Sequence, residues 1–391
     1  MAAGAVATLW IRLCRRRNHA PVTAKAIRST AAVHRVELCD MMIAVYWAAE
    51  SSFETIVANF NRPERNLSKT NPFVRQRISI YRGNGRTAIM TVPFWMTKLQ
   101  QLWRLVRESH AQPIQGQQQK PMAITPEETA ITFIGHSSFL LQIAGHALLI
   151  DPVFATRLIL LRRQRHPGVH VRDLPRIDAV LLTHAHMDHL NRPSLRAITR
   201  EMRRRGLPAP LAIVPNGVED LVRDLGFSRT ETLKWWQSTE LGPLHITATP
   251  AKHWGARMFS DTHRGYGGYL IEGAGAPRIY HSGDTAFFAG FTEIGQRLRP
   301  DIALLPIGAY YPDSYRSVHT SPEEALQAFL HLGAEGMVPM HYNTFRLGRE
   351  PMDEPLPRLL AAAVKAGVGD RIHALAEGES WLPQVRTEVV R

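Results

Sequence analysis

The segment from Leu181 to His189 reads Leu-Leu-Thr-His-Ala-His-Met-Asp-His and carries four potential metal ligands within six positions. An apolar run leads directly into it, which is typical of a buried strand. Alternate side chains of an extended chain point the same way, so His184 and His186 project to one side. Asp188 and the adjacent histidine diverge and can serve a second ion a few ångströms away. One ion cannot readily use all four groups, so the segment predicts two neighbouring metal ions.

The run His-x-His-x-Asp-His resembles the signature of the metallo-β-lactamase superfamily. In that family the remaining ligands come singly from loops after later strands. His253, Asp284 and His341 each follow a predicted strand in the same order, although each alone would be explained equally well by an ordinary structural role. The resemblance implies that His184, His186 and His253 bind one zinc, that Asp188, His189 and His341 bind a second, and that Asp284 bridges them. It also implies that Asp151 orients a ligand histidine from behind.

The same resemblance implies the chemistry. Two zinc ions about 3.5–4 Å apart bring the pKa of a water between them down to about 7, and that water attacks a phosphoryl or carbonyl centre. Asp284 would keep the spacing of the ions, and Asp188 would orient the attacking oxygen. His319 precedes a predicted helix N-terminus, where a phosphate is favoured, so we expect it to contact the developing charge or the leaving group. His136 either lines the pocket or bonds a neighbouring loop.

Further short motifs narrow the resemblance. They are Gly135-His136, Asp151-Pro152-Val153-Phe154, His253-Trp254, Gly283-Asp284-Thr285, Pro306-Ile307-Gly308-Ala309-Tyr310 and His319-Thr320-Ser321-Pro322. Together they are similar to the branch that contains the N-acyl-phosphatidylethanolamine-hydrolysing phospholipase D and bacterial relatives likened to ascorbate-6-phosphate lactonase. The resemblance covers roughly residues 130–383. It implies an α/β protein of the αββα type, with two mixed sheets face to face, helices outside and the metals at one rim.

We therefore expect a dizinc phosphodiesterase of phospholipase D type that acts on N-acyl phosphatidylethanolamine-like or related phosphodiesters. A lactonase or another carbonyl hydrolase with the same centre is the first alternative, and a non-catalytic scaffold is the second. The His-rich ligand set favours zinc, while iron or manganese stays open.

The net charge of +13 belongs to the N-terminal part of the chain. Residues 1–120 carry 18 Lys+Arg against 6 Asp+Glu, which leaves 29 against 28 for residues 121–391. A nearly neutral body argues against nucleic acid as a partner. Cys14 and Cys39 are the only cysteines, so a metal site further along must use nitrogen and oxygen ligands.

We expect three regions: a basic, disordered N-terminal extension over 1–90, an amphipathic helix and linker over 91–128, and the hydrolase domain over 129–391. The extension has no acidic residue before Glu37, which is typical of an organellar transit peptide. The favoured interpretation is an unstructured tail, or else an upstream stretch ahead of a true start at Met90 or Met96. The apolar run Met41–Ala49 is too short to cross a bilayer. The expected location is cytoplasmic, with peripheral membrane contact left open.

Two segments mix apolar and basic side chains. Phe94–Val106 has an apolar helical face that includes Trp95 and Trp103, with a basic rim. Packing on the protein's own core is the favoured interpretation, and a lipid surface is the alternative. Ala155–His170 places four arginines among leucines, which suits either a solvated loop or an entrance that attracts anionic substrates or lipid head groups.

Short apolar stretches alternate along the chain with turn residues and helical patterns. They predict strands over Ile131–Ile134, Phe139–Ile143, His146–Ile150, Asp178–Leu182, Leu211–Val214, Ile246–Thr249, Ile279–His281, Ile302–Leu305 and Met337–Pro339. Helices are expected over Arg192–Arg205, Val218–Leu225, Phe288–Leu298 and Pro322–Leu332. The last has a complete start signal, because Ser321 can cap and Glu324 can close a capping box.

Overall fold

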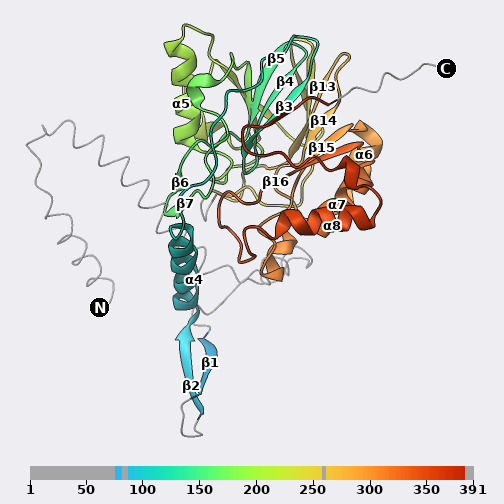
Figure 1. The fold of residues 1–391 in the computed structure, drawn as a ribbon. Helices are drawn as coiled ribbons and strands as arrows, with labels where there is room; N and C mark the ends of the chain where they lie inside the picture. Colours follow the sequence, from blue (N-terminus) through green and yellow to red (C-terminus); the bar gives the residue numbers. More distant parts are fainter. Residues whose placement is uncertain (1–74, 82–86, 258–260, 384–391) are drawn as a thin grey trace, which may run out of the picture. The chain divides into compact units, whose positions relative to one another are not determined.

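The computed structural model describes residues 75–81, 87–257 and 261–383, with side chains from residue 100 onward. The chain divides into two units, residues 1–44 and 45–391, and everything described below belongs to the second unit. Figure 1 shows the course of the chain.

The strands are β1 (Arg75–Tyr81), β2 (Thr87–Pro93), β3 (Ala130–Gly135), β4 (Ser138–Ile143), β5 (His146–Ile150), β6 (Arg157–Leu158), β7 (Leu161–Arg162), β8 (Ala179–Leu181), β9 (Leu211–Pro215), β10 (Thr230–Leu233), β11 (Ser238–Leu241), β12 (Leu244–Thr249), β13 (Gly268–Gly273), β14 (Ile279–His281), β15 (Ile302–Pro306), β16 (Gly336–Met340) and β17 (Ser380–Trp381). The α-helices are α4 (Phe94–Ser109), α5 (Arg192–Arg204), α6 (Gly290–Leu298), α7 (Pro322–Leu332) and α8 (Pro355–Lys365). Short 3₁₀ helices cover Val171–Asp173, Glu219–Leu221, Asp313–Ser317 and Gly369–Arg371.

Two mixed sheets form the body of this unit. The seven-stranded sheet has the order β10-β9-β8-β5-β4-β3-β17, and the six-stranded sheet has the order β11-β12-β13-β14-β15-β16. In the first sheet the strands from β10 to β5 run parallel, and β5 to β17 alternate in direction. In the second, β11 to β14 alternate and β14 to β16 run parallel.

Alternation along each strand decides the layers, because successive side chains face opposite sides of a sheet. On β4, Phe139 and Leu141 enter a core shared with Ile246 and Ile271 of the other sheet. Leu140, between them, instead enters the cluster that contains α5. The outer face of the second sheet is covered by α6, α7 and α8, whose apolar side chains form one cluster with β13–β16. The result is the αββα sandwich that the resemblance implied, with α5 on one side and α6–α8 on the other (Figure 1).

The topology also places the functional residues. Asp151 and the predicted metal ligands follow the carboxyl ends of strands: Asp151 follows β5, His184 to His189 follow β8, His253 follows β12, Asp284 follows β14 and His341 follows β16. Helix α7 then starts with the predicted capping box. The Ser321 side chain accepts from the Glu324 backbone N–H, and the Glu324 side chain accepts from the Ser321 backbone N–H.

Some expectations about local structure were wrong. Arg75–Tyr81 and Thr87–Pro93 pair as an antiparallel hairpin, so this described part of the 1–90 extension has regular structure. The helix expected over Val218–Leu225 is reduced to a 3₁₀ turn over Glu219–Leu221, consistent with the high cost of nucleating a helix in a short segment. The strands β10, β11 and β13 and the helix α8 were not predicted. β10 and β11 are largely polar, so they give no apolar signal.

The amphipathic helix predicted from Phe94 is present as α4, and its side chains are described from residue 100. Leu102 and Val106 are half-buried, whereas Trp103 is 67% exposed. Trp103 therefore does not pack into the core in the way that we favoured. No helix among the described residues is long and apolar enough to cross a membrane.

Candidate metal centre

The loop after β8 brings its ligand-type side chains together through local geometry. The chain leaves the strand extended and then turns, because the carbonyl of His186 accepts from the N–H groups of His189 and Leu190 at 3.1 and 2.7 Å. Helix α5 starts directly afterwards, with Asn191 as its N-cap accepting from the Ser194 N–H. A strand, a tight turn and a capped helix thus fix the four candidate ligands that lie between His184 and His189.

Three imidazoles form the first cluster, and their ring nitrogens converge. Nε2 of His184 lies 2.8 Å from Nδ1 of His186, and Nε2 of His253 lies 3.3 Å from the same Nδ1. All three ligand atoms lie within 4.8 Å of one another, which suits a shared metal ion. The structure therefore brings together the three residues that were predicted to bind one zinc.

Hydrogen bonds on the outer side of the rings select the tautomers. Nδ1 of His184 lies 2.9 Å from Oγ1 of Thr183, and that hydroxyl donates to Asp151. The hydroxyl must then accept from Nδ1–H of His184, which leaves Nε2 with a lone pair directed into the cluster. Nδ1 of His253 donates in the same way to the carbonyl of Val318 at 2.9 Å. Partners of this kind orient metal-binding histidines and raise their basicity.

The second cluster joins Asp188, His189 and His341, with His136 as a fourth member that the sequence had not assigned. Nε2 of His341 lies 3.6 Å, and Nε2 of His189 3.7 Å, from Oδ2 of Asp188. His136 approaches the same oxygen through Nε2 at 3.0 Å. Of the two roles considered for His136, the structure shows the hydrogen bond to a neighbouring loop, and the bonded group is a candidate ligand.

Asp151 is fully buried and organises the floor of the centre. Its Oδ1 accepts from the Thr183 N–H at 2.8 Å, and its Oδ2 accepts from the Thr183 hydroxyl at 2.5 Å. Oδ2 also faces Nδ1 of His189 at 2.7 Å. This contact fixes Nδ1 of His189 as the donor and leaves Nε2 for the cluster. Asp151 thus lies behind His189, as the resemblance implied.

Asp284 lies between the two clusters. Its Oδ2 is within 4.0 Å of an imidazole Nε2 from each of five histidines: His341 at 3.0 Å, His189 at 3.2 Å, His319 at 3.5 Å, and His184 and His253 at 4.0 Å. A carboxylate that contacts members of both clusters has the geometry of a bridging group.

Burial and charge set the protonation of these side chains. Burial lowers the pKa of His186 to about 4 and holds the pKa values of His184 and His253 well below 6.5, so these rings stay neutral. Burial also opposes the charged form of His189, but the neighbouring carboxylates outweigh it and raise its pKa well above 6.5. The pKa of His341 is raised to about 9 against the same desolvation, chiefly by Asp284.

The donor set fits divalent metal ions. Nε2 of His189, Nε2 of His341 and Oδ1 of Asp284 are buried and have no hydrogen-bond partner among the described residues. Buried polar atoms are normally satisfied, so several such atoms at one place call for a ligand. Imidazole nitrogens and carboxylate oxygens are the groups that bind zinc in the absence of cysteine. A metal ion would also compensate the buried carboxylates of Asp188 and Asp284.

The backbone around the centre is strained. His136, Asp151 and His341 have φ values of 62°, 44° and 61°, although none of them is glycine. Each such conformation costs on the order of 1–3 kcal/mol and persists where the surroundings enforce it, most often at functional sites. The backbone N–H of His341 donates to the carbonyl of His136 at 2.8 Å, so two of these residues hold each other.

His319 lies beside the clusters, just before the N-terminus of α7. Its ring centroid is 5.2 Å from that of His253 and 5.4 Å from that of His341. Its Nδ1 is buried and lacks a partner among the described residues. His319 therefore lies next to the centre, and 12% of its side chain is exposed.

Sequence reasoning missed three residues that position the site. Thr183 links Asp151 to His184. The Arg257 guanidinium donates to the carbonyls of Ala185 and Leu190 at 2.8 and 2.9 Å and so ties the ligand loop to the segment after His253. The carbonyl of Val318 orients His253. A backbone acceptor and an arginine in a loop give no sequence signal, whereas Thr183 stands within the quoted motif.

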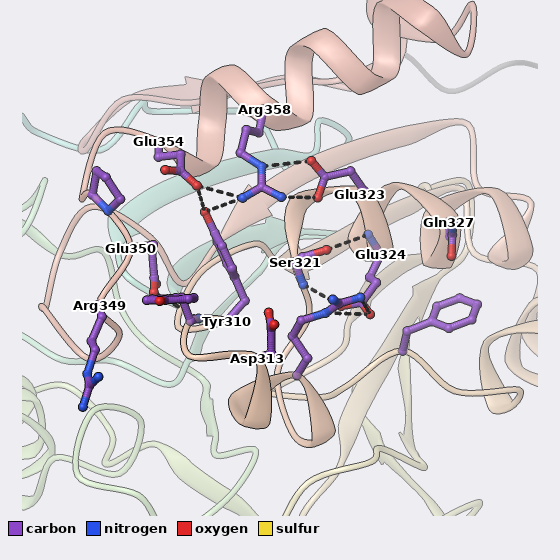
Figure 2. A pocket seen from close by; sticks show the side chains of 14 residues that line it. Tyr310, Asp313, Ser321, Glu323, Glu324, Gln327, Arg349, Glu350, Glu354 and Arg358 are labelled. Carbon is purple, nitrogen blue, oxygen red and sulfur yellow. Dashed lines mark hydrogen bonds and ion pairs between the residues drawn. The ribbon is translucent and has the colours of Figure 1, made fainter. Parts of the chain in front are cut away.

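A polar cavity of about 520 Å³ lies between α7, α8 and the segment around Tyr310, and none of the candidate metal ligands lines it (Figure 2). Its lining is dominated by charged groups that pair with one another. Arg358 bonds both Glu323 and Glu354, and Tyr310 donates its hydroxyl to Glu354 at 2.7 Å. The residues that pair here are thereby committed to holding α7 and α8 together.

The fold and the centre define a class of protein. A family model described as the beta-lactamase superfamily domain matches residues 146–342, which is about half of the chain, and the chain belongs to this superfamily with a metallo-β-lactamase fold. An uncharacterized protein of Mycobacterium tuberculosis is 37% identical over 248 residues, which are 60% of this chain and 64% of that protein. The match thus spans less than two thirds of that relative's length.

Two further similarities concern proteins whose names state an activity. The N-acyl-phosphatidylethanolamine-hydrolyzing phospholipase D 1 of Caenorhabditis elegans is 32% identical over 246 residues, covering 57% of this chain and 67% of that protein. The solved structure of Igni18, a metallo hydrolase from Ignicoccus hospitalis, has a TM-score of 0.51 and 27% identity, covering 66% of this chain and 99% of that chain.

Proposed function

We propose that this protein is a dizinc hydrolase that cleaves phosphodiester bonds in the manner of a phospholipase D, with an N-acyl phosphatidylethanolamine-like lipid as substrate. The observation that carries the proposal is the position of Asp284, whose Oδ2 lies within 4.0 Å of Nε2 atoms from both histidine clusters. The similarity to the phospholipase D of Caenorhabditis elegans supports the phosphodiester substrate over the other reactions of the superfamily.

In this proposal His184, His186 and His253 hold one zinc, Asp188, His189 and His341 hold the other, and Asp284 bridges. A bound zinc pair supplies a Lewis acid and lowers the pKa of a coordinated water to about 7. His136 contributes by holding Asp188 through the 3.0 Å contact at Oδ2. Asp188 then has one oxygen fixed by this contact, so its carboxylate keeps a constant orientation toward the attacking water.

His319 acts on the leaving group. Water adds its oxygen to phosphorus, the bond from phosphorus to the alcohol oxygen breaks, and that oxygen needs a proton as it departs. Nε2 of His319 lies 3.5 Å from Oδ2 of Asp284, which places the ring at the edge of the centre rather than within a ligand cluster. We infer that His319 gives this proton to the alcohol, so the products are a phosphatidic acid and an N-acylethanolamine.

The site excludes bulk water from most of the proposed ligands while leaving one side open. His184, His189 and Asp284 are 3% exposed or less. Asp188 and His319 retain 14% and 12% side-chain exposure, so these two proposed catalytic groups lie on the accessible side. Low exposure strengthens the electrostatic interactions of the centre with a bound phosphate.

The test combines metal content with turnover on purified full-length protein. We expect about two zinc ions per chain, and hydrolysis of bis(4-nitrophenyl) phosphate and of N-acyl phosphatidylethanolamine in detergent micelles. The substitutions His186→Ala and Asp284→Ala should remove metal and activity together. Arg297→Ala is a matched control, because Arg297 pairs with Glu293 at the exposed surface of α6.

Turnover of a simple lactone without any phosphodiester hydrolysis would move the assignment to a carbonyl hydrolase. A protein that binds no metal, and shows no activity after zinc is added, would leave only the scaffold interpretation.

A further inference from the structure

A two-residue turn joins β6 and β7 and presents aliphatic side chains to solvent. Leu158 pairs with Leu161 across the hairpin, and Ile159 and Leu160 form the turn between them. Ile159 is 39% and Leu160 38% exposed. Tight hairpin turns in water are normally built from glycine, asparagine and aspartate, so an Ile-Leu pair at this place is unusual.

The backbone at this turn makes the choice of residues costly. Ile159 has a φ of 55°, a left-handed conformation in which a β-branched side chain is a steric outlier. Leu160 is not among the residues with positive φ, so the turn follows the II′ pattern, which favours glycine at the first central position. Neither turn stability nor solubility explains these two residues, which leaves contact with an apolar phase as their role.

The surroundings of the turn are positively charged. No acidic residue occurs from Pro152 to Arg172, while five arginines do. Arg157, at the base of the hairpin, is exposed, and no ion pair links it to any residue that the structure describes. Of the other arginines in this segment, Arg163 is buried and Arg165 pairs with Glu377. An exposed apolar tip with an unpaired cation beside it is complementary to an anionic phospholipid surface.

Helix α4 is attached to the same hairpin. Its C-terminal end is bonded to the hairpin: Arg162 N–H donates to Oγ of Ser109 at 3.1 Å, and the Gln164 side chain donates to the Ser109 carbonyl at 2.8 Å. Trp103, which lies six residues before Ser109, is 67% exposed. Arg107 is also exposed. Tryptophan is the side chain most suited to the polar–apolar boundary of a bilayer.

The base of the hairpin is connected to the metal centre. Leu158 packs with Val153 and Phe345 in a small buried cluster. The Phe345 ring meets the His136 ring edge-on at 5.3 Å, and His136 bonds Asp188. The hairpin is thereby linked to Asp188 through the packed rings of Phe345 and His136.

We propose that the Ile159–Leu160 turn, flanked by Arg157 and by Trp103 and Arg107 of α4, docks on an anionic phospholipid bilayer. We call these five residues the hairpin patch. The aliphatic turn enters the apolar boundary, and the arginines contact lipid phosphates. The proposal deepens the lipid substrate proposed above, but it concerns binding and can be tested without turnover.

The experiment measures flotation of the full-length protein with vesicles of phosphatidylcholine alone, and with vesicles that contain added phosphatidylserine. We expect binding to the anionic vesicles only. The double substitution Ile159→Gly and Leu160→Ser supplies the residues that a II′ turn favours, so it should keep or raise the melting temperature. It should nevertheless weaken vesicle binding by about ten-fold or more, because two apolar side chains no longer leave water.

A matched control removes exposed apolar side chains elsewhere. Leu330→Gln with Val364→Gln, on α7 and α8, alters residues that are 45% and 72% exposed and should leave vesicle binding unchanged. Arg157→Gln should weaken binding to anionic vesicles by about five-fold, since one cation near such a surface contributes about that factor. Hydrolysis of bis(4-nitrophenyl) phosphate is followed in every variant and should not change.

Vesicle binding by the Gly-Ser variant equal to that of the unsubstituted protein would overturn the proposal, as would failure of the unsubstituted protein to bind. Self-association that disappears in the Gly-Ser variant, without vesicle binding, would assign the patch to a second copy of the chain. Loss of phosphodiester hydrolysis with normal vesicle binding would instead count against the proposed function and leave the docking surface standing.

Discussion

Replacing Asp151 by asparagine tests how the centre is held together. The carboxylate accepts three hydrogen bonds, from the N–H and the hydroxyl of Thr183 and from Nδ1 of His189, at 2.8, 2.5 and 2.7 Å. An asparagine can keep the first through its carbonyl oxygen. Its NH₂ group would then face two donors, so the His189 ring must move its proton to Nε2 to accept a bond at Nδ1. The nitrogen directed at the centre would lose its lone pair.

The expected magnitudes follow from these contacts. Loss of an outer partner of a ligand histidine weakens metal binding by about 10- to 100-fold. Turnover at saturating zinc should fall further, by a factor on the order of 10⁴, since a wrong tautomer in a comparable carboxylate–histidine pair costs about that much. The metal-free variant should lose about 2 kcal/mol of unfolding free energy, because a buried charge-assisted hydrogen bond is replaced by a mismatched pair.

The assay is zinc affinity by competition with a chromogenic chelator, together with thermal and urea unfolding of the metal-free proteins. Asp301→Asn is the control: Asp301 also accepts from a backbone N–H and a side chain, both of Arg278, but it is one-third exposed. This control should leave zinc affinity unchanged and cost less than about 1 kcal/mol. Zinc affinity of Asp151→Asn within two-fold of the unsubstituted protein would refute the argument about the His189 tautomer.

Three further outcomes are expected. His319→Ala should lower kcat for a lipid phosphodiester by a factor on the order of 10² while leaving zinc content intact, and unchanged kcat would remove His319 from the reaction. His136→Leu should weaken zinc binding by about ten-fold, because the donor to Asp188 is lost. His136→Gln can still donate and should keep most of the zinc affinity. Equal defects in both variants would show that the packing of the ring matters instead. Zinc affinity should rise with pH between about 6.5 and 9, by about one logarithmic unit per pH unit for each of His189 and His341. The affinity rises with pH because the pKa values of both rings are raised in the metal-free protein, to about 9 for His341, so zinc must displace their protons at lower pH. A zinc affinity that does not change with pH would mean that these rings are neutral before metal binds.

Much of the candidate site was visible in the sequence because its geometry is local. The order of ligands from His184 to His189 depends on a strand end and one tight turn, both set by neighbouring residues. The capping box at Ser321 likewise depends on residues three positions apart, and it formed as predicted. The strands β4 and β5 were predicted from short apolar stretches bounded by turn residues, and both formed close to the predicted bounds.

The tertiary structure alone decided the contacts between elements distant in the chain. Asp151 lies 38 residues before His189, and Val318 lies 65 residues after His253, yet each fixes a ring tautomer through one hydrogen bond. The position of Asp284 among five imidazoles depends on how the second sheet lies against the first, which is set by the shared core between them and not by any local pattern.

The hairpin was also beyond the sequence. Ile159 and Leu160 lie within Ala155–His170, which we interpreted either as a solvated loop or as an entrance for anionic substrates. Only the fold shows that the chain reverses there, with a positive φ at Ile159, and leaves both side chains in solvent. The sequence by itself therefore identified the residues that build the centre, because they follow strand ends in local motifs. The orientation of their side chains and the exposed hairpin beside them depend on the packing of the two sheets and their loops.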